Sequence, residues 1–450
     1  MKLQNAALPF ILLMVGNSSL GAQETSSPAP HHITLEEAVQ LALIHNHAVR
    51  IAGFKVQEKE HAKDVARSAY FPSLRNESSV AHITDLQHVE IPAGSLGNVG
   101  GSEIPPRTIT LLQGAQTFET SGTSLSQPLT QLLKIRAKND IAFAELNATR
   151  SEADETKNEV ALNVRRIYYG LLIAHLHRAA LDAGYAALQD AEKERVAQVK
   201  YGSALDQDLI ESKAQSLQAK QELLTADLQI SDLTMQLNDV IGLPLDTKLV
   251  LDSSAPPTRE PCVLDDCGRL ALQSHPEVKI AEQQVEGASA AVRLAKRDYI
   301  PNTEVFARYS YENNVPFLVH NFGTFGFLMT YDIFDGGRRH AELDEQKSAL
   351  DEANENLARV REEVQLRVRV AYDKLERTRE MVAVSQELLS LREESRRVAD
   401  EQLKRGAALQ SQADLSAAHE LEAKAGLLQS QLDYSQAQDE LVVAIGQTPK

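Results

Sequence analysis

The sequence predicts a mainly α-helical, internally duplicated protein with two long coiled-coil helical hairpins and a small β portion. Three observations support this fold class. Residues 338–447 lack proline and carry apolar residues at heptad spacing. Residues 130–241 repeat that design. Between the helical parts, shorter segments lose the helical period and alternate apolar with polar residues, as strands do.

The hairpin expected at residues 338–447 carries two offset heptad series in a background of Ala, Glu, Lys, Arg and Gln. The series are Leu343, Leu350, Leu357, Val364 and Ala371, and Val368, Leu375, Val382 and Leu389. Such heptads are typical of a long coiled-coil helix. Two series indicate partners on both sides, so we expect this helix to lie inside a wall of helices. Gly406, preceded by Lys404 and Arg405, indicates a helix stop. The first arm of about 67 residues would then be roughly 100 Å long.

The first half of the chain repeats this organisation. Lys200-Tyr201-Gly202-Ser203-Ala204 matches Lys404-Arg405-Gly406-Ala407-Ala408. Upstream, Leu35–Leu43 and Tyr70-Phe71-Pro72 match Leu264–Leu272 and Tyr299-Ile300-Pro301 at a constant spacing of 229 residues. Two unrelated helices would not keep this register, so we infer duplication. The expected repeats are 23–250 (helices 34–70, strands at about 74–90 and 108–127, hairpin 130–241) and 251–450 (helices 263–299, strands at about 302–312 and 321–334, hairpin 338–447).

The amino terminus and the composition indicate an exported, folded protein. Residues 1–22 read as a secretory signal, with an apolar core of about ten residues and small residues before Ala22. The first cysteine is Cys262, so we expect no lipid anchor on an amino-terminal cysteine. Hydrophobic residues make up 43% of the chain, which suits a folded protein, and a net charge of −17 argues against nucleic acid as a partner.

The two cysteines are open to more than one interpretation. Cys262 and Cys267 align with Ile33 and Ala38 of the first half, which are apolar positions around a helix start. We therefore expect two small buried hydrophobic side chains and leave a local disulfide open. We expect no metal pair, because no further ligands stand at suitable spacing.

The strands of the second half are rich in aromatic residues. Nine of the 22 Phe and Tyr residues fall between Phe306 and Phe334. Alternation with clustered aromatics suits a membrane β-barrel, whereas a soluble hairpin packed on the helices is the alternative. About four strands per chain cannot close a barrel, since the smallest common barrels have eight. If the strands enter a membrane, other copies of the chain must therefore pair with their edges. Residues 91–107 are expected to form a long exposed loop.

Several motifs together resemble the TolC family of outer-membrane efflux channels, over nearly the whole mature chain. They are Thr34-Leu35-Glu36-Glu37-Ala38, the Tyr-x-Pro helix ends, Tyr331-Asp332-Ile333-Phe334-Asp335-Gly336-Gly337 and the two glycine-centred tips. The resemblance implies a homotrimer in the bacterial outer membrane, with a twelve-stranded β-barrel among the lipids and a twelve-helix tunnel (a trimeric α-barrel) through the periplasm. It also implies docking of the hairpin tips onto a periplasmic adaptor, which joins a proton-driven or ATP-driven inner-membrane pump.

The resemblance also implies functional residues at the tips. In the family an acidic residue commonly stands six positions after the tip glycine. Here Asp208 holds that position in the first tip with Glu211 beyond it, and Gln412 departs from the pattern in the second tip, where Asp414 stands nearby. A ring of carboxylates in a narrow aperture would favour cations; the alternative for Glu211 and Asp414 is a solvated helix face. The expected adaptor contacts are Val199, Gly202, Ser203, Leu403, Gly406 and Ala407.

We expect neither an enzyme nor a cofactor-binding protein. The sequence has no phosphate-binding glycine loop, zinc-protease helix motif or nucleophile elbow. The leading hypothesis is a passive exit duct of a tripartite efflux or secretion system. A periplasmic adaptor is one alternative, although adaptors usually carry a single hairpin between compact β-domains. A structural coiled-coil protein without a pore is another, and it leaves the aromatic strands unexplained.

Overall fold

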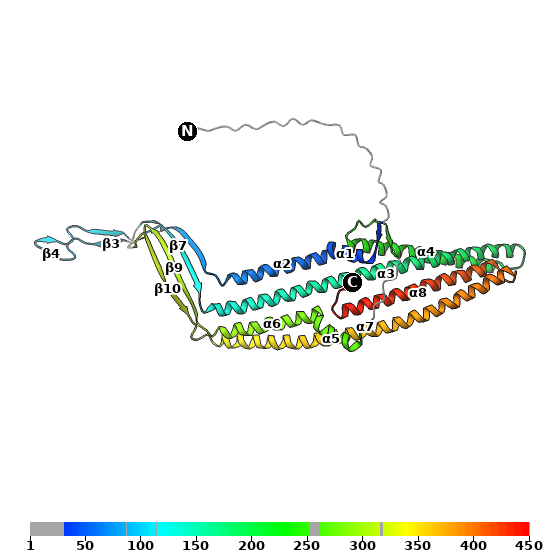
Figure 1. The fold of residues 1–450 in the computed structure, drawn as a ribbon. Coiled ribbons are helices and arrows are strands. Elements are labelled where there is room, and N and C mark those ends of the chain that lie inside the picture. Colours follow the sequence, from blue (N-terminus) through cyan, green and yellow to red (C-terminus); the bar gives the residue numbers. More distant parts are fainter. Residues whose placement is uncertain (1–30, 87, 113–114, 253–261, 316–317, 450) are drawn as a thin grey trace, which may run out of the picture.

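The computed structural model describes residues 31–86, 88–112, 115–252, 262–315 and 318–449. The chain is an elongated rod, with its long strands towards one end and two helical hairpin tips at the other (Figure 1). The signal peptide expected at residues 1–22 lies outside the described part. None of the described helices is both long enough and apolar enough to pass through a bilayer.

The first half contains two short helices, two long strands and a long helical hairpin. These elements are α1 (Leu35–His45), α2 (His47–Ser68), β2 (Ser73–His82), β7 (Thr117–Pro128), α3 (Gln131–Lys200) and α4 (Asp206–Ile241). A capping box starts α1 at Thr34: the Glu37 N–H donates to Thr34 Oγ1 (3.3 Å) and the Thr34 N–H donates to Glu37 Oε2 (3.0 Å). The two helices meet at Asn46, which leaves the helical conformation and accepts from the Ala48 N–H at 2.8 Å.

The second half repeats this order. Its elements are α5 (Leu264–Ser274), α6 (Pro276–Arg297), β9 (Asn302–Asn313), β10 (Asn321–Thr330), α7 (Arg338–Lys404) and α8 (Gln410–Ala444). His275 occupies the place of Asn46 between the short helices, and its Nδ1 accepts from the Glu277 N–H at 3.3 Å. Both halves therefore break their first helix with a side-chain cap.

The strand expected to run to residue 334 ends at Thr330 instead. The reason is Arg339, whose guanidinium contacts the residues of the turn between β10 and α7. Its Nε donates to Asp335 Oδ2 at 2.5 Å, and the guanidinium lies over the rings of Tyr331 (4.9 Å) and Tyr299 (5.6 Å). The Arg339 hydrogen bond lowers the pKa of Asp335 to about 2. The turn leaves Phe334 89% exposed at the junction between strands and helices.

The helices form a wall one layer thick and four helices wide. Near the strands the order of neighbours is α2, α3, α6, α7, and towards the tips it is α4, α3, α8, α7 (Figure 1). The long helices α3 and α7 run through both levels, and each shorter helix accompanies only half of a long one. The expectation that the helix at residues 338–404 lies inside the wall, with partners on both sides, is wrong for the single chain: α7 packs against α6 and α8 but lies at one edge of the wall.

The long strands form one antiparallel sheet in the order β10–β9–β7–β2. The β7–β9 ladder joins the two halves of the chain, so β2 and β10 are left as open edges. The register separates two faces. One face carries apolar side chains at its β9–β10 side and at several other positions, together with the polar residues Asn76, Ser78, Glu119, Ser121 and Thr123 of β2 and β7; its apolar residues are Leu74, Val80, Leu125, Val305, Ala307, Tyr309, Tyr311, Phe325, Phe327 and Met329. The opposite face carries more of the charged side chains, namely Arg75, Glu77, Glu304, Arg308 and Glu312.

The loop expected at residues 91–107 is more ordered than the sequence indicates. The chain beyond β2 forms a narrow ribbon of β3 (His88–Ile91) with β6 (Ile109–Leu112), and a smaller pair of β4 (Asn98–Val99) with β5 (Ser102–Glu103). The strands expected at about 74–90 and 108–127 are each divided by this arrangement. Turn residues and weak alternation hid these short strands in the sequence.

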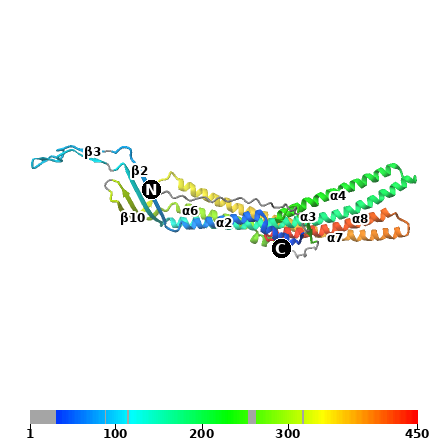
Figure 2. The ribbon, with the colours of Figure 1, turned by 90° about the horizontal axis from the view of Figure 1, so that it is seen from above.

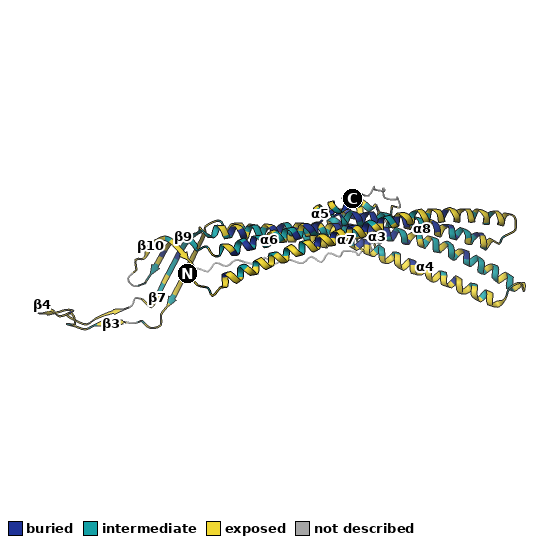
Figure 3. Cartoon of the chain, turned by 90° about the horizontal axis from the view of Figure 1, so that it is seen from below, coloured by how far each residue is buried: buried dark blue, intermediate teal, exposed yellow. Residues whose placement is uncertain are grey.

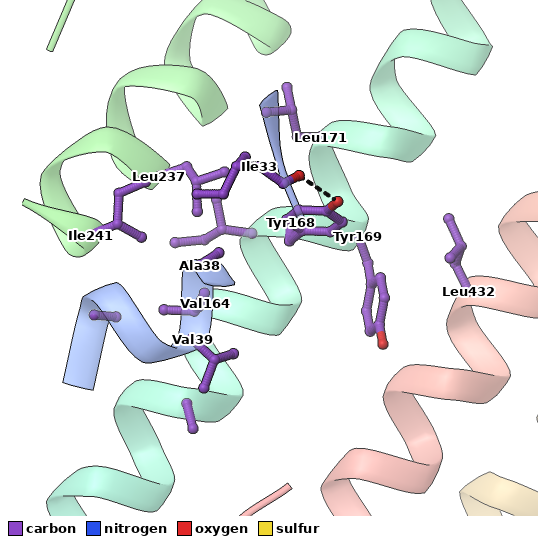
Figure 4. Close-up of a cluster of buried hydrophobic side chains, with 13 residues drawn as sticks. Ile33, Ala38, Val39, Val164, Tyr168, Tyr169, Leu171, Leu237, Ile241 and Leu432 are labelled. Carbon is purple, nitrogen blue, oxygen red and sulfur yellow. Dashed lines mark hydrogen bonds between the residues drawn. The ribbon is translucent and has the colours of Figure 1, made fainter. Parts of the chain in front are cut away.

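Two hydrophobic cores lie at mid-height, where the short helices meet the long ones. In the first core, Tyr168 of α3 is buried between α1, α4 and the two-stranded sheet of β1 (His31–Ile33) and β8 (Leu249–Leu251). Its hydroxyl lies 3.1 Å from Ile33 O (Figure 4). The same hydroxyl lies 3.1 Å from Asp252 O and accepts from the Asp252 N–H at 3.0 Å. These hydrogen bonds hold the end of β8, where the chain passes from the first half to the second, against α3.

In the second core, Cys267 is fully buried between α5, α7 and α8. The interpretation of the two cysteines as separate hydrophobic side chains is wrong: Cys262 and Cys267 form a disulfide, with their Cα atoms 5.7 Å apart. Helix α5 starts between them, and its first turn, closed by the Cys267 N–H and Val263 O at 2.9 Å, brings the two side chains together. The structure therefore has the alternative that the sequence left open.

Candidate functional site

Each hairpin tip turns on a glycine in the left-handed conformation. Gly202 has φ +75° and Gly406 φ +71°. In both tips the residue after the glycine donates its N–H back to the helix, from Ser203 to Gln198 O and from Ala407 to Gln402 O, each at 2.9 Å. These are the Schellman-type closures that glycine favours. The two tips are built alike, as the duplication predicts.

The two principal aperture candidates both cap a helix. The Leu205 N–H donates to Asp208 Oδ2 at 3.2 Å, and the Leu409 N–H donates to Gln412 Oε1 at 3.3 Å. Each side chain thus satisfies a backbone donor at the start of its helix. An acceptor oxygen is sufficient for this role, which explains why glutamine can stand in the second tip. Both side chains are exposed.

The two remaining acidic candidates hydrogen-bond on their own helices. Glu211 accepts from Gln215 at 3.3 Å, and Asp414 accepts from Gln410 at 2.9 Å. Within one chain, therefore, the four predicted aperture residues do not gather into one cluster. Any ring of these groups requires other copies of the chain.

The expected adaptor contacts surround the two turns. Gly202, Ser203, Gly406 and Ala407 are exposed, whereas Val199 and Leu403 are half-buried at the helix ends. Both turns stand at the same end of the rod (Figures 1 and 2). A partner that approaches this end meets both sets of residues.

The tips are joined by a contact that the sequence analysis missed. Glu194 on α3 accepts two hydrogen bonds from Ser411 of α8, from its N–H at 3.2 Å and from its hydroxyl at 2.5 Å. The carboxylate lies at the amino-terminal end of α8, where the helix dipole stabilises negative charge. Glu194 is one of many acidic residues on a heptad helix, so only the packing of the hairpins distinguishes it.

The outer helices of the wall each carry an exposed apolar stripe near the tips. On α4 the stripe is Ile210, Leu217 and Leu224, and these side chains are 68%, 68% and 55% exposed. On α7 it is Val384, Leu391 and Val398, at 67%, 63% and 39%. Both stripes have heptad spacing, which is typical of a coiled-coil contact. Figure 3 shows α4 mostly exposed along its length.

The two stripes match in height. Helix α4 runs away from its tip and α7 runs towards its tip, so positions can be counted from the tip glycines. Leu217 stands 15 residues after Gly202, and Leu391 stands 15 residues before Gly406. The other two pairs, Ile210 with Val398 and Leu224 with Val384, are equally matched at 8 and 22 residues. The stripes lie on opposite edges of one wall, so they cannot meet within a chain.

Two charged clusters join the halves at mid-height. Arg165 on α3 and Asp439 on α8 form an ion pair of 3.0 Å with side chains only 5% and 8% exposed. Nearby on the wall, Glu277 pairs with Arg367 and hydrogen-bonds Glu155 of α3. Burial, followed by that hydrogen bond, raises the pKa of Glu155 to about 7. These groups couple α3 to the helices of the second half.

The described residues include no group of three or more His, Cys, Asp or Glu side chains placed to hold a metal ion.

Comparisons with known proteins agree with this architecture. The family model described as outer membrane efflux protein matches residues 268–447. No curated protein matches the chain by sequence. Among solved structures, the CmeC outer membrane channel of Campylobacter jejuni is similar with a TM-score of 0.73 and 16% identity, covering 97% of this chain and 94% of that one. CusC is similar with a TM-score of 0.71 and 16% identity, covering 92% of this chain and 92% of that one. The outer membrane protein VceC of Vibrio cholerae is similar with a TM-score of 0.71 and 14% identity, covering 92% of this chain and 96% of that one.

Proposed function

We propose that this chain, a TolC-like outer-membrane efflux protein, is the exit duct of a tripartite efflux system, a passive channel that extends from the outer membrane into the periplasm. The fold is the expected one, mainly helical with a small sheet, and it matches the fold of structural neighbours that combine a helical barrel with a β-barrel. The structural relatives are channel proteins. Neither the adaptor nor the non-pore coiled-coil alternative is favoured.

The single observation that carries the proposal is that every layer of the chain is an open arc of four elements. The sheet has four long strands with β2 and β10 as open edges, and the wall has four helices at each level. Three copies would supply twelve strands and twelve helices. A closed barrel satisfies the edge strands, whose backbone groups cannot face lipid unpaired. The apolar face of the sheet then meets lipid and the charged face meets the water of the lumen.

The same closure explains the exposed stripes on α4 and α7. Rotation about the barrel axis places α4 of one chain beside α7 of the next. Because Leu217 and Leu391 stand at the same height, the two stripes would pack in register as an antiparallel seam. We name this contact the α4–α7 seam, formed by Ile210, Leu217 and Leu224 with Val398, Leu391 and Val384 of the next chain.

The tips would form the inner aperture and the docking site of a periplasmic adaptor, which joins an inner-membrane pump. The hydrogen bonds of Glu194 to Ser411 hold the two hairpins of one chain together, which supports a closed resting state. Opening then requires a partner that binds the parted hairpins more tightly than the joined ones. In a trimer three copies of Asp208 would line the aperture and favour cations.

The channel is tested in planar lipid bilayers with the purified full-length protein. The proposal expects trimers that conduct ions, and a water-soluble monomer without conductance would overturn it. Glu194→Gln, which keeps the size of the side chain but weakens both hydrogen bonds, should raise the open fraction. Glu192→Gln, at a half-buried position on the same helix, serves as the control and should leave it unchanged.

The role of Asp208 is tested by separating its charge from its cap. Asp208→Asn keeps an acceptor oxygen for the Leu205 N–H but removes the carboxylate charge. We expect lower cation selectivity with unchanged thermal stability. Asp208→Ala should lose selectivity and also some stability, because the cap is lost. If selectivity survives both substitutions, Asp208 does not line the aperture.

A further inference from the structure

The ribbon of β3 and β6 has one wholly apolar face. In its antiparallel ladder Val89 is opposite Leu111, and Ile91 is opposite Ile109. Residues opposite each other share a face, and so do residues two apart on one strand. The four side chains therefore point to the same side. The other face carries the polar residues His88, Glu90 and Thr110.

This apolar face is largely open in the single chain. Val89 is 63% exposed, Leu111 50% and Ile109 41%. Figure 1 shows the ribbon projecting beyond the four-stranded sheet, on the side away from the helices. A lone two-stranded ribbon is marginally stable in water. An ordered ribbon with an open apolar face indicates that something covers it in the assembled protein.

Lipid hydrocarbon does not suit the position of the ribbon. The sheet ends on this side in a polar rim, and the ribbon lies beyond it (Figure 1). The polar residues of this rim are His82, Thr117, Asn313, Asn314, His320 and Asn321, and the exposed apolar residues Ile83, Leu318 and Val319 lie beside them. Polar residues at strand ends mark the point where a membrane strand leaves the bilayer. The cover must therefore lie in the water outside the membrane.

We propose that the apolar faces of three ribbons pack against one another on the axis of the trimer and close its outer mouth. The proposal rests on the proposed function, since it needs three chains around one axis. The chain enters the ribbon from β2 and leaves it into β7, and both strands belong to the sheet whose edges other copies complete. The closure that completes the barrel thus brings the three ribbons together.

The dimensions allow this contact. Twelve strands about 4.8 Å apart and tilted by about 40° form a barrel with a radius of roughly 12 Å. Sheet faces pack about 10 Å apart. Ribbons that rise from the rim therefore need to lean inward by roughly 6 Å to meet. The resulting plug of Val89, Ile91, Ile109 and Leu111 is a hydrophobic constriction, which closes a pore by excluding water. It forms an outer gate, separate from the helical tips.

The arrangement is tested by single cysteine substitutions in the full-length protein in outer membranes. Side chains near a threefold axis approach their own copies, so Leu111→Cys should couple two chains through a disulfide on mild oxidation. Thr110→Cys, on the polar face of the same strand, is the matched control and should not couple. The native cysteines are joined to each other and do not interfere.

A second measurement reads the gate itself. In the Glu194→Gln background, which opens the helical tips, Val89→Ser combined with Leu111→Ser should remove the remaining closed intervals from single-channel traces, while Thr110→Ser leaves them in place. The outer gate is overturned if Leu111→Cys does not couple in trimers whose α4–α7 seam does couple through cysteines at positions 217 and 391. That result would leave the proposed function intact. The outer gate is also overturned if Leu111→Cys is protected from a water-soluble maleimide without coupling, because another molecule then covers the face. Absence of trimers would instead overturn the proposed function.

Discussion

Replacing Leu217 with serine tests the α4–α7 seam at its centre. Leu217 is 68% exposed in the single chain, and full burial of a leucine side chain stabilises by about 1.5–3 kcal/mol. Burying the exposed two-thirds in the seam contributes roughly 1–2 kcal/mol for each chain. Three seams then lose roughly 3–6 kcal/mol in Leu217→Ser, which is about a 10²- to 10⁴-fold increase in the dissociation constant of the trimer.

The assay is the fraction of trimer against urea concentration in detergent, measured by native mass or by gel. Gln215→Ser is the matched control, because position 215 lies about 160° around the helix from Leu217 and is also exposed. A direct test of register combines Leu217→Cys with Leu391→Cys, which should link neighbouring chains into covalent trimers. Gln215→Cys with Leu391→Cys should not. The seam is refuted if Leu217→Ser trimers are as stable as wild-type trimers and the Leu217→Cys, Leu391→Cys variant does not couple its chains.

Three further predictions test the helices. Arg165→Ala removes the cation that pairs with Asp439, a carboxylate only 8% exposed that also accepts from the Tyr169 hydroxyl at 3.4 Å. The loss of the cation should destabilise the fold by up to about 3–5 kcal/mol in urea unfolding; a change below about 1 kcal/mol would contradict it. Gly406→Ala should lower the melting temperature, since an alanine in the left-handed conformation costs roughly 1–2 kcal/mol. Gly426→Ala, in open space within α8, is the control and should raise the melting temperature. Equal effects of the two substitutions would contradict the left-handed conformation of Gly406. Burial raises the pKa of Glu155 from 4.5 to about 7, so the folded state holds a proton that the unfolded state releases, and stability falls as pH rises through this window. Glu155→Gln should flatten the loss of melting temperature between about pH 5 and 8, measured by circular dichroism; an unchanged slope would show that another group titrates.

Much of the fold could be predicted because the sequence is internally duplicated. Heptad spacing, the absence of proline and the glycine turns define α3, α4, α7 and α8, and the duplication makes each pattern a check on the other. The end of β10 could not be predicted, because Tyr331 and Ile333 continue the alternation of a strand. Only in three dimensions does Arg339 draw Asp335 and the tyrosine rings into a turn.

The tips show the same limit at the level of single residues. Their glycines could be located from the sequence, since a left-handed turn at the end of a helix requires that residue type. The roles of Asp208 and Gln412 as caps follow from backbone geometry that a resemblance does not supply. Glu194 could not be found at all, because its partner Ser411 is 217 positions away in the chain.

The sequence by itself determined the long helices of this protein, their approximate lengths, their duplication and the need for further copies. These follow from local periodicity and from counting strands, which require no knowledge of what lies beside them. Only the tertiary structure decided which faces remain uncovered. The stripes on α4 and α7 and the apolar side of the β3–β6 ribbon read like ordinary core positions in the sequence, because a side chain's neighbours depend on elements distant in the chain.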